Sequence, residues 1–95
     1  MPDINKIENI NEKRCKQLRQ IQDEALELFK KKNKDYGDAF ATMGTVGVLV
    51  RLQDKLMRAI SITNNGVNLV DDEKIEDTLK DMHNYSAMAL MLLKE

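Results

Sequence analysis

The chain has 95 residues, of which 42% are hydrophobic and 33% are charged. It is too short for two ordinary domains and too apolar to be disordered, so we expect a single domain over residues 1–95. Its 15 basic and 16 acidic residues leave a net charge of −1, so the chain has no overall positive charge that would attract nucleic acid or an anionic membrane. The single cysteine, Cys15, fits a reducing cytoplasm, and no apolar run approaches the roughly eighteen residues that a membrane span needs. We therefore expect a cytoplasmic protein.

The composition, with one proline and no tryptophan, favours amphipathic helices over strands. A first helix is predicted from about residue 4 to residue 33, because apolar residues recur there at intervals of three and four. Lysines near its end complement the helix dipole, and Gly37 can adopt the left-handed conformation that ends a helix. The apolar face consists of Leu18, Ile21, Ala25, Leu28 and Phe29. The acids Glu24 and Glu27 are expected to face solvent and remain reserve metal ligands.

Two residues after this helix could contact a ligand. A helix cap explains most of the segment 32–38, but it does not explain Tyr36, whose ring could stack on a base while Lys34 reaches a phosphate. An irregular piece is expected around residues 38–45.

A second helix is predicted from about Thr45, a favourable N-cap, to Asn64. Its apolar stripe consists of Leu49, Leu52, Leu56, Ala59 and Ile60. Away from this stripe lie Arg51, Asp54 and Arg58, with Lys55 at their flank. One interpretation is a set of surface ion pairs, each stabilising by only a few tenths of a kcal/mol. The functional interpretation makes Asp54 a metal ligand and directs the basic residues to phosphate oxygens.

A third helix is predicted to begin at Asp71 or Asp72. Its expected buried face consists of Ile75, Leu79, Met82, Ser86, Ala89 or Leu90, and Leu93. Residues 87–93 are apolar all round, more than a lone three-helix domain can cover. We therefore expect an all-α fold, a small bundle of three main helices that a partner chain completes as a homo-oligomer, either a dimer or a tetramer.

The third helix also carries a polar face. At 100° per residue, Asp77, Asp81 and Asn84 project together, roughly opposite the stripe led by Ile75 and Met82. They are either a solvated surface or, together with the acid of the second helix, ligands of a hard cation such as Mg²⁺. His83 has no second ligand at metal spacing and is expected to be hydrogen-bonded, and no chemistry is assigned to Cys15.

Three sequence blocks suggest a family. The runs KNKDYGDAF, RLQDKLMRA and EDTLKDMHNYSAMAL resemble nucleotide modification associated domain 1, found in bacteria and their phages, over roughly residues 25–95. More distantly, an acid on one helix facing spaced acids on the next is similar to the MazG-like all-α nucleoside triphosphate pyrophosphohydrolases. Those enzymes hold Mg²⁺ with carboxylates of adjacent helices and cut between the α and β phosphates. The spacing Asp81-x-x-Asn84 parallels their Glu-x-x-Asp element, with an amide in place of the final acid.

From these observations we expect a Mg²⁺-dependent nucleotide-binding protein, an enzyme of the nucleoside triphosphate pyrophosphohydrolase type that acts in nucleotide metabolism or base modification. The expected metal ligands are Asp54, Asp77, Asp81 and Asn84. The expected substrate-binding residues are Lys34, Tyr36, Arg51, Lys55 and Arg58. The alternative is a non-catalytic helical module that oligomerises and binds a partner.

Overall fold

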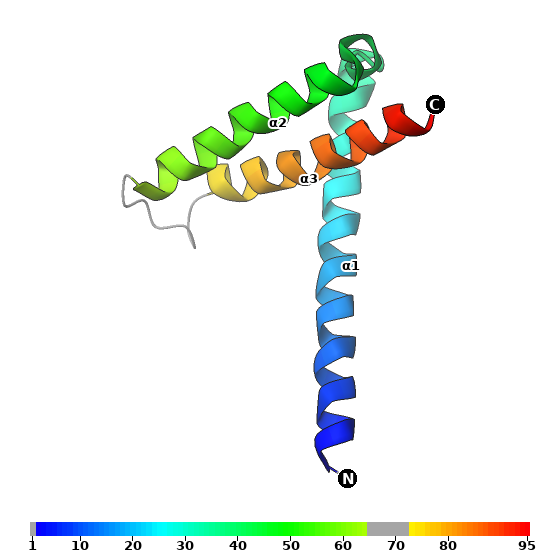
Figure 1. Cartoon of the computed structure of the whole chain (residues 1–95), viewed down its shortest axis with the longest axis vertical. Coiled ribbons are helices and arrows are strands. Elements are labelled where there is room, and N and C mark those ends of the chain that lie inside the picture. Colours follow the sequence, from blue (N-terminus) through cyan, green and yellow to red (C-terminus); the bar gives the residue numbers. More distant parts are fainter. Residues whose placement is uncertain (1, 65–72) are drawn as a thin grey trace.

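The computed structural model describes residues 2–64 and 73–95 (Figure 1). Within these ranges the chain forms α1 (Pro2–Tyr36), α2 (Phe40–Asn64) and α3 (Glu73–Lys94), and no strand. The all-α prediction is confirmed for this part of the chain. None of the three helices is long and apolar enough to cross a membrane, as far as the described residues extend.

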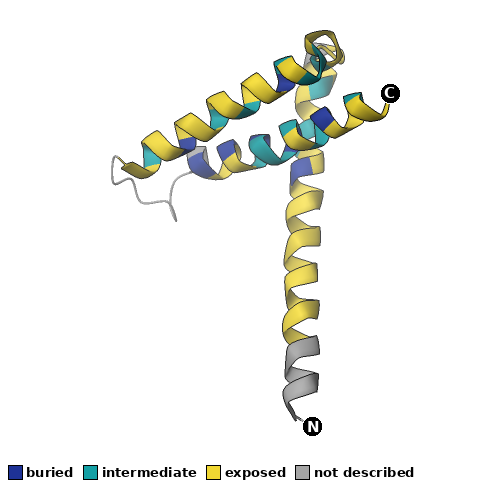
Figure 2. Cartoon of the chain, viewed as in Figure 1, coloured by how far each residue is buried: buried dark blue, intermediate teal, exposed yellow. Residues whose placement is uncertain are grey.

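The helices form a hairpin with a long arm. α2 packs along α3, and α1 crosses this pair near its own carboxyl end (Figure 1). Residues 9–24 of α1 are exposed throughout, so the amino-terminal part of the helix stands apart from the hairpin (Figure 2). The buried apolar residues lie where the helices meet and are Ala25, Val48, Ala59, Ile75 and Ala89. The chain therefore has a thin core along the contact between α2 and α3 and where α1 crosses them, and little burial elsewhere (Figure 2).

The dimensions of the chain confirm that it is open. Its radius of gyration is 16.5 Å, whereas about 12 Å is typical of a compact domain of this length. Its accessible surface is 7587 Å², against about 5,600 Å² for a folded monomer of 10.9 kDa. About 2,000 Å² per chain is thus left uncovered relative to an ordinary small protein.

The predicted apolar stripes are covered only in part. Ala25, Ala59 and Ile75 are buried as expected, and of the alternatives Ala89 and Leu90 it is Ala89 that is buried. Other stripe residues that we expected to be buried are exposed in the single chain: Leu18, Ile21, Leu49, Leu56, Ile60, Leu79 and Leu93. Periodicity identified residues that can be buried, but one chain supplies too few helices to cover them all.

The segment between α1 and the regular part of α2 agrees with the prediction in its main features. Gly37 and Asp38 both have a left-handed backbone, with φ of 57° and 66°, and the Gly37 amide donates to the Asn33 carbonyl at 2.9 Å. This arrangement ends α1, as expected for a glycine cap. α2 spans Phe40–Asn64, but the backbone of Gly44 is not helical and divides it into a short first piece and a regular helix from Thr45, where the second helix was predicted to begin. The irregular piece expected around residues 38–45 corresponds to the turn at Gly37 and Asp38, this short piece and the kink at Gly44.

Gly44 allows the kink because its φ of 72° and ψ of 172° lie in a region that only glycine adopts easily. No atom lies within 4 Å of a Cβ placed on Gly44, so a substitution there meets backbone strain alone. We expect Gly44→Ala to lower the free energy of unfolding by about 1 to 3 kcal/mol in urea titrations followed by circular dichroism. Ser61→Ala, at an exposed site in the regular part of α2, is the control and should change it by less than about 0.5 kcal/mol. Equal effects of the two substitutions would contradict the strain argument.

Candidate functional site

The polar face of α3 is turned toward α1. Asn84 is buried, and its side-chain amide donates a 2.9 Å hydrogen bond to the carbonyl oxygen of Ala25. Its carbonyl oxygen lies 3.0 Å from Nδ1 of His83, which therefore has the hydrogen-bonded role expected of it. The sequence left two alternatives for this face, a solvated surface or a set of metal ligands. In the structure Asp81 and Asn84 are instead buried against the other helices and Asp77 is exposed, because α3 packs against α2 and α1 on different sides. Asn84 thus joins α3 to α1 through a hydrogen bond to the backbone of α1.

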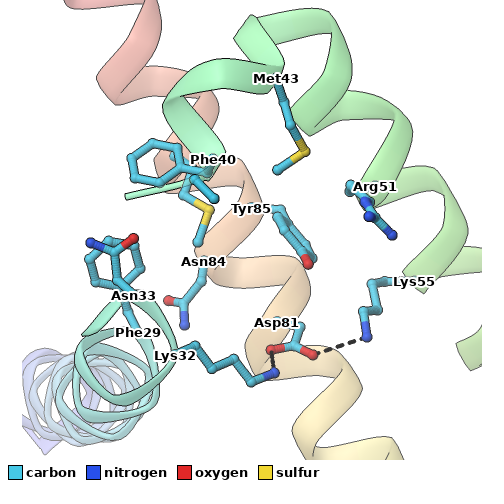
Figure 3. A pocket seen from close by; sticks show the side chains of 12 residues that line it. Phe29, Lys32, Asn33, Phe40, Met43, Arg51, Lys55, Asp81, Asn84 and Tyr85 are labelled. Carbon is cyan, nitrogen blue, oxygen red and sulfur yellow. Dashed lines mark hydrogen bonds and ion pairs between the residues drawn. The ribbon is translucent and has the colours of Figure 1, made fainter. Parts of the chain in front are cut away.

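Asp81 lies one turn before Asn84 and connects all three helices. Its Oδ1 lies 2.7 Å from Nζ of Lys32 on α1, and its Oδ2 lies 3.2 Å from Nζ of Lys55 on α2 (Figure 3). The carboxylate is only 9% exposed, whereas the two lysine side chains are 47% and 30% exposed. Each carboxylate oxygen therefore has a cationic partner, and each of those partners still reaches solvent.

These residues line a cleft of about 410 Å³ between the three helices. This size lies in the range of small-molecule sites. The rings of Phe29 and Phe40 meet edge to face on one side, with centroids 6.0 Å apart. The full lining consists of Phe29, Lys32, Asn33, Ala39, Phe40, Met43, Arg51, Lys55, Asp81, Asn84, Tyr85 and Met88. The cleft combines an aromatic wall with a charged one (Figure 3).

The charged wall has an excess of cations. Lys32, Arg51 and Lys55 face a single carboxylate, that of Asp81, so the lining carries two more positive than negative charges. Arg51 lies one helical turn before Lys55 on α2 and thus on the same side of that helix. Arginine and lysine donate charge-assisted hydrogen bonds to phosphate and carboxylate oxygens. The electrostatics of the cleft favour an anionic ligand.

The predicted acidic cluster does not form within one chain. Asp54 and Asp77 are both exposed, and neither lines the cleft that contains Asp81 and Asn84. Among the described residues, no group of three or more His, Cys, Asp or Glu side chains could hold a metal ion. Because both oxygens of Asp81 already contact lysines, the donor set in this cleft does not fit Mg²⁺.

The predicted substrate-binding residues are divided by the structure. Arg51 and Lys55 line the cleft, whereas Lys34 and Arg58 are exposed and do not. The side chain of Tyr36 lies outside the described residues. The two reserve ligands form ion pairs: Oε1 of Glu24 lies 3.9 Å from Nζ of Lys80, and Oε1 of Glu27 lies 3.1 Å from Nζ of Lys30. Neither glutamate lines the cleft.

Several lining residues were not predicted, although helical spacing could have indicated them. Lys32 follows Phe29 and Ala25 at intervals of three and four, so these three residues share one face of α1. Tyr85 follows Asp81 by four positions on α3. Periodicity therefore selects Lys32 from the lysine run 30–34, whereas we had singled out Lys34.

Comparison with known proteins gives one result of substance. No curated protein and no solved structure matches the chain. A family model, that of nucleotide modification associated domain 1, matches residues 32–93. This segment covers well over half of the chain and begins at Lys32, so it includes every lining residue of the cleft except Phe29. The chain therefore belongs to the nucleotide modification associated domain 1 family.

Proposed function

We propose that the cleft binds a nucleotide. Its phosphates would lie on Lys32, Arg51 and Lys55, and its base would lie against the aromatic wall of the cleft. The observation that carries this proposal is the convergence of three cations, from two helices, beside aromatic rings in one cleft of about 410 Å³. A nucleotide combines an anionic group with a flat apolar ring, the two features that these walls complement. The family's name also associates it with nucleotide modification.

The proposal predicts stabilisation by nucleotides. A ligand present at a hundred times its dissociation constant adds about 2.7 kcal/mol to the stability of the folded chain. For a chain of this length we expect a rise in melting temperature of about 10 °C or more with the best nucleotide. Inorganic phosphate and an uncharged nucleoside, tested alongside, should each give a smaller rise, because each engages only one wall. The proposal fails if no nucleotide of a full set of bases raises the melting temperature, with or without Mg²⁺.

Arg51 and Arg58 form a matched pair for testing the site, since they lie on the same helix and only Arg51 lines the cleft. Arg51→Gln should weaken nucleotide binding by about ten- to a hundredfold, as expected when one charge-assisted hydrogen bond is lost. Arg58→Gln should leave the affinity within about twofold. Isothermal titration with the nucleotide found by thermal shift measures both. A larger loss with Arg58→Gln would place the phosphates outside the cleft.

Mg²⁺-dependent hydrolysis stays a prediction from the distant resemblance to pyrophosphohydrolases. The acids that it needs do not converge in one chain, so nucleotide binding is the part that the cleft supports. The test is to incubate the protein with each nucleoside triphosphate and Mg²⁺ and to assay for nucleoside monophosphate and pyrophosphate. Product formation that Asp81→Asn removes would support this reaction.

We also propose that the protein is a homo-oligomer. Its uncovered surface, about 2,000 Å² more than a compact monomer of this mass exposes, supports this. The same observation favours the second candidate function, a helical module whose main role is assembly. The two functions differ in the nucleotide titrations, since a pure assembly module would show no nucleotide-dependent rise in melting temperature.

A further inference from the structure

A long apolar depression runs between α2 and α3 on the side of the hairpin away from the cleft. Its main side chains are Leu49, Leu56 and Ile60 of α2 with Leu79 and Met82 of α3. At 100° per residue, these side chains point about 100 to 180° away from the cleft residues of the same helix, on α2 and on α3 alike. We call this depression the hairpin groove. It leaves the cleft open, because the two lie on different sides of the same pair of helices.

The hairpin groove is free of fixed charge. Among the described residues that line it, none is Asp, Glu, Lys or Arg, although a third of the chain is charged. Leu56 is 44% exposed and Leu79 is 53% exposed, so large apolar side chains reach solvent on both walls. Monomeric soluble proteins rarely leave such continuous apolar surfaces uncovered, and they mark sites of association.

The uncovered area is sufficient for a stable dimer. An interface of standard size buries about 800 Å² on each partner. Each chain as a whole exposes about 2,000 Å² more than a compact monomer, a surplus to which both the free part of α1 and the hairpin groove contribute. Because the core of one chain is small, the hairpin buries much of its apolar surface only when it associates, so its partner must always be available. A second copy of the chain meets this requirement whenever the protein is made.

The absence of charge identifies the groove as a surface that can pack on itself. In a twofold interface the same patch of both subunits meets, so charges near the axis face their own copies and repel. The exposed apolar residues of α1, such as Leu18, lie beside Arg14 and Arg19 and lack this property. We propose that the hairpin groove is the twofold interface of a homodimer, in which two α2–α3 hairpins pack face to face as a four-helix bundle.

This interface rests on the proposed homo-oligomer, and two substitutions separate the two ideas. Light scattering of the unmodified chain at micromolar concentration should give twice 10.9 kDa. Leu56→Glu places a charge in the groove of both copies and should weaken dimerisation at least a hundredfold, giving a monomer. Leu18→Glu makes the same change at a leucine of α1 that is 54% exposed, and it should leave the mass unchanged.

The outcomes are distinct. A 10.9 kDa mass for the unmodified chain overturns the homo-oligomer and the interface together. A dimer that persists in Leu56→Glu but dissociates in Leu18→Glu overturns the interface alone and leaves the homo-oligomer standing.

A second measurement applies if Leu56→Glu does not fold. In a Cys15→Ser background, Gln53→Cys puts a thiol in the groove and Ser61→Cys puts one elsewhere on α2. A short bismaleimide should link copies of Gln53→Cys and leave Ser61→Cys single. The reverse result overturns the interface.

Discussion

Replacing Asp81 with asparagine is expected to destabilise the fold and, in the same protein, to strengthen the binding of a phosphate-bearing ligand. The carboxylate contacts Lys32 and Lys55 at 2.7 and 3.2 Å, so its removal leaves two cations without their partner. Because both lysines reach solvent, the expected loss is about 1 to 2 kcal/mol of the free energy of unfolding, less than for a fully buried pair. Urea titration measures it.

The gain in affinity follows from the same contacts. A phosphate must compete with Asp81 for the lysines and is repelled by its negative charge, and asparagine removes both effects. We expect nucleotide affinity without Mg²⁺ to rise by about tenfold, measured by isothermal titration. Asp77→Asn is the control, since Asp77 lies one turn earlier on α3, is exposed and does not line the cleft. Loss of binding in Asp81→Asn only when Mg²⁺ is present would instead make Asp81 a metal ligand.

The largest loss of stability is expected from Asn84→Asp. This change replaces the amide that donates to the Ala25 carbonyl with a group that can only accept, and it buries a negative charge three residues after Asp81. The Ala25 carbonyl keeps its hydrogen bond within α1, but loss of the Asn84 donor costs about 0.5 to 1.5 kcal/mol, and an uncompensated buried charge costs several kcal/mol more. We expect a total of about 3 kcal/mol or more, a large share of the stability of a small domain.

Circular dichroism in urea measures this loss, and Asn11→Asp provides the matched control. Asn11 is exposed on the free part of α1, so the same chemical change there should alter the free energy of unfolding by less than about 0.5 kcal/mol. Similar values for the two variants would mean that the contact between Asn84 and Ala25 contributes little to holding α1 on the hairpin.

Helical periodicity was sufficient to predict the three helices but not their packing. The spacing of apolar residues indicates where a helix lies and which residues can be buried. It does not indicate that α3 packs against two neighbours, α2 on one side and α1 on another. For this reason the sequence allowed Asp81 and Asn84, which share a face with the exposed Asp77, to be either solvated residues or metal ligands, and it did not indicate that they are buried against the other helices.

The charged residues of the site were predicted in part for a similar reason. Arg51 and Lys55 were found because a polar face of α2 is readable from the sequence, but that face extends further around the helix than the cleft and also includes Asp54 and Arg58. Which part of a polar face borders a cleft depends on the angle at which helices cross, and one sequence does not specify this angle. The start of the regular part of α2 at Thr45 was predicted, whereas the short helical piece that begins at Phe40, before the break at Gly44, was not.

Because α1 is long and attached only near its carboxyl end, a small tilt at the attachment moves its free end by a large distance. The helix is held at Ala25 and beyond, whereas residues 9–24 lie free of the hairpin, so the free segment measures about 24 Å at 1.5 Å per residue. A tilt of about 10° at the crossing moves its far end by about 4 Å, by the geometry of a rigid helix. Lys32 lies on the attached part of α1 and lines the cleft, so we expect a change in its contacts there to tilt the helix. A pair of spectroscopic labels, one at Ile10 and one on α2, would therefore convert a small change at the cleft into a displacement large enough to measure.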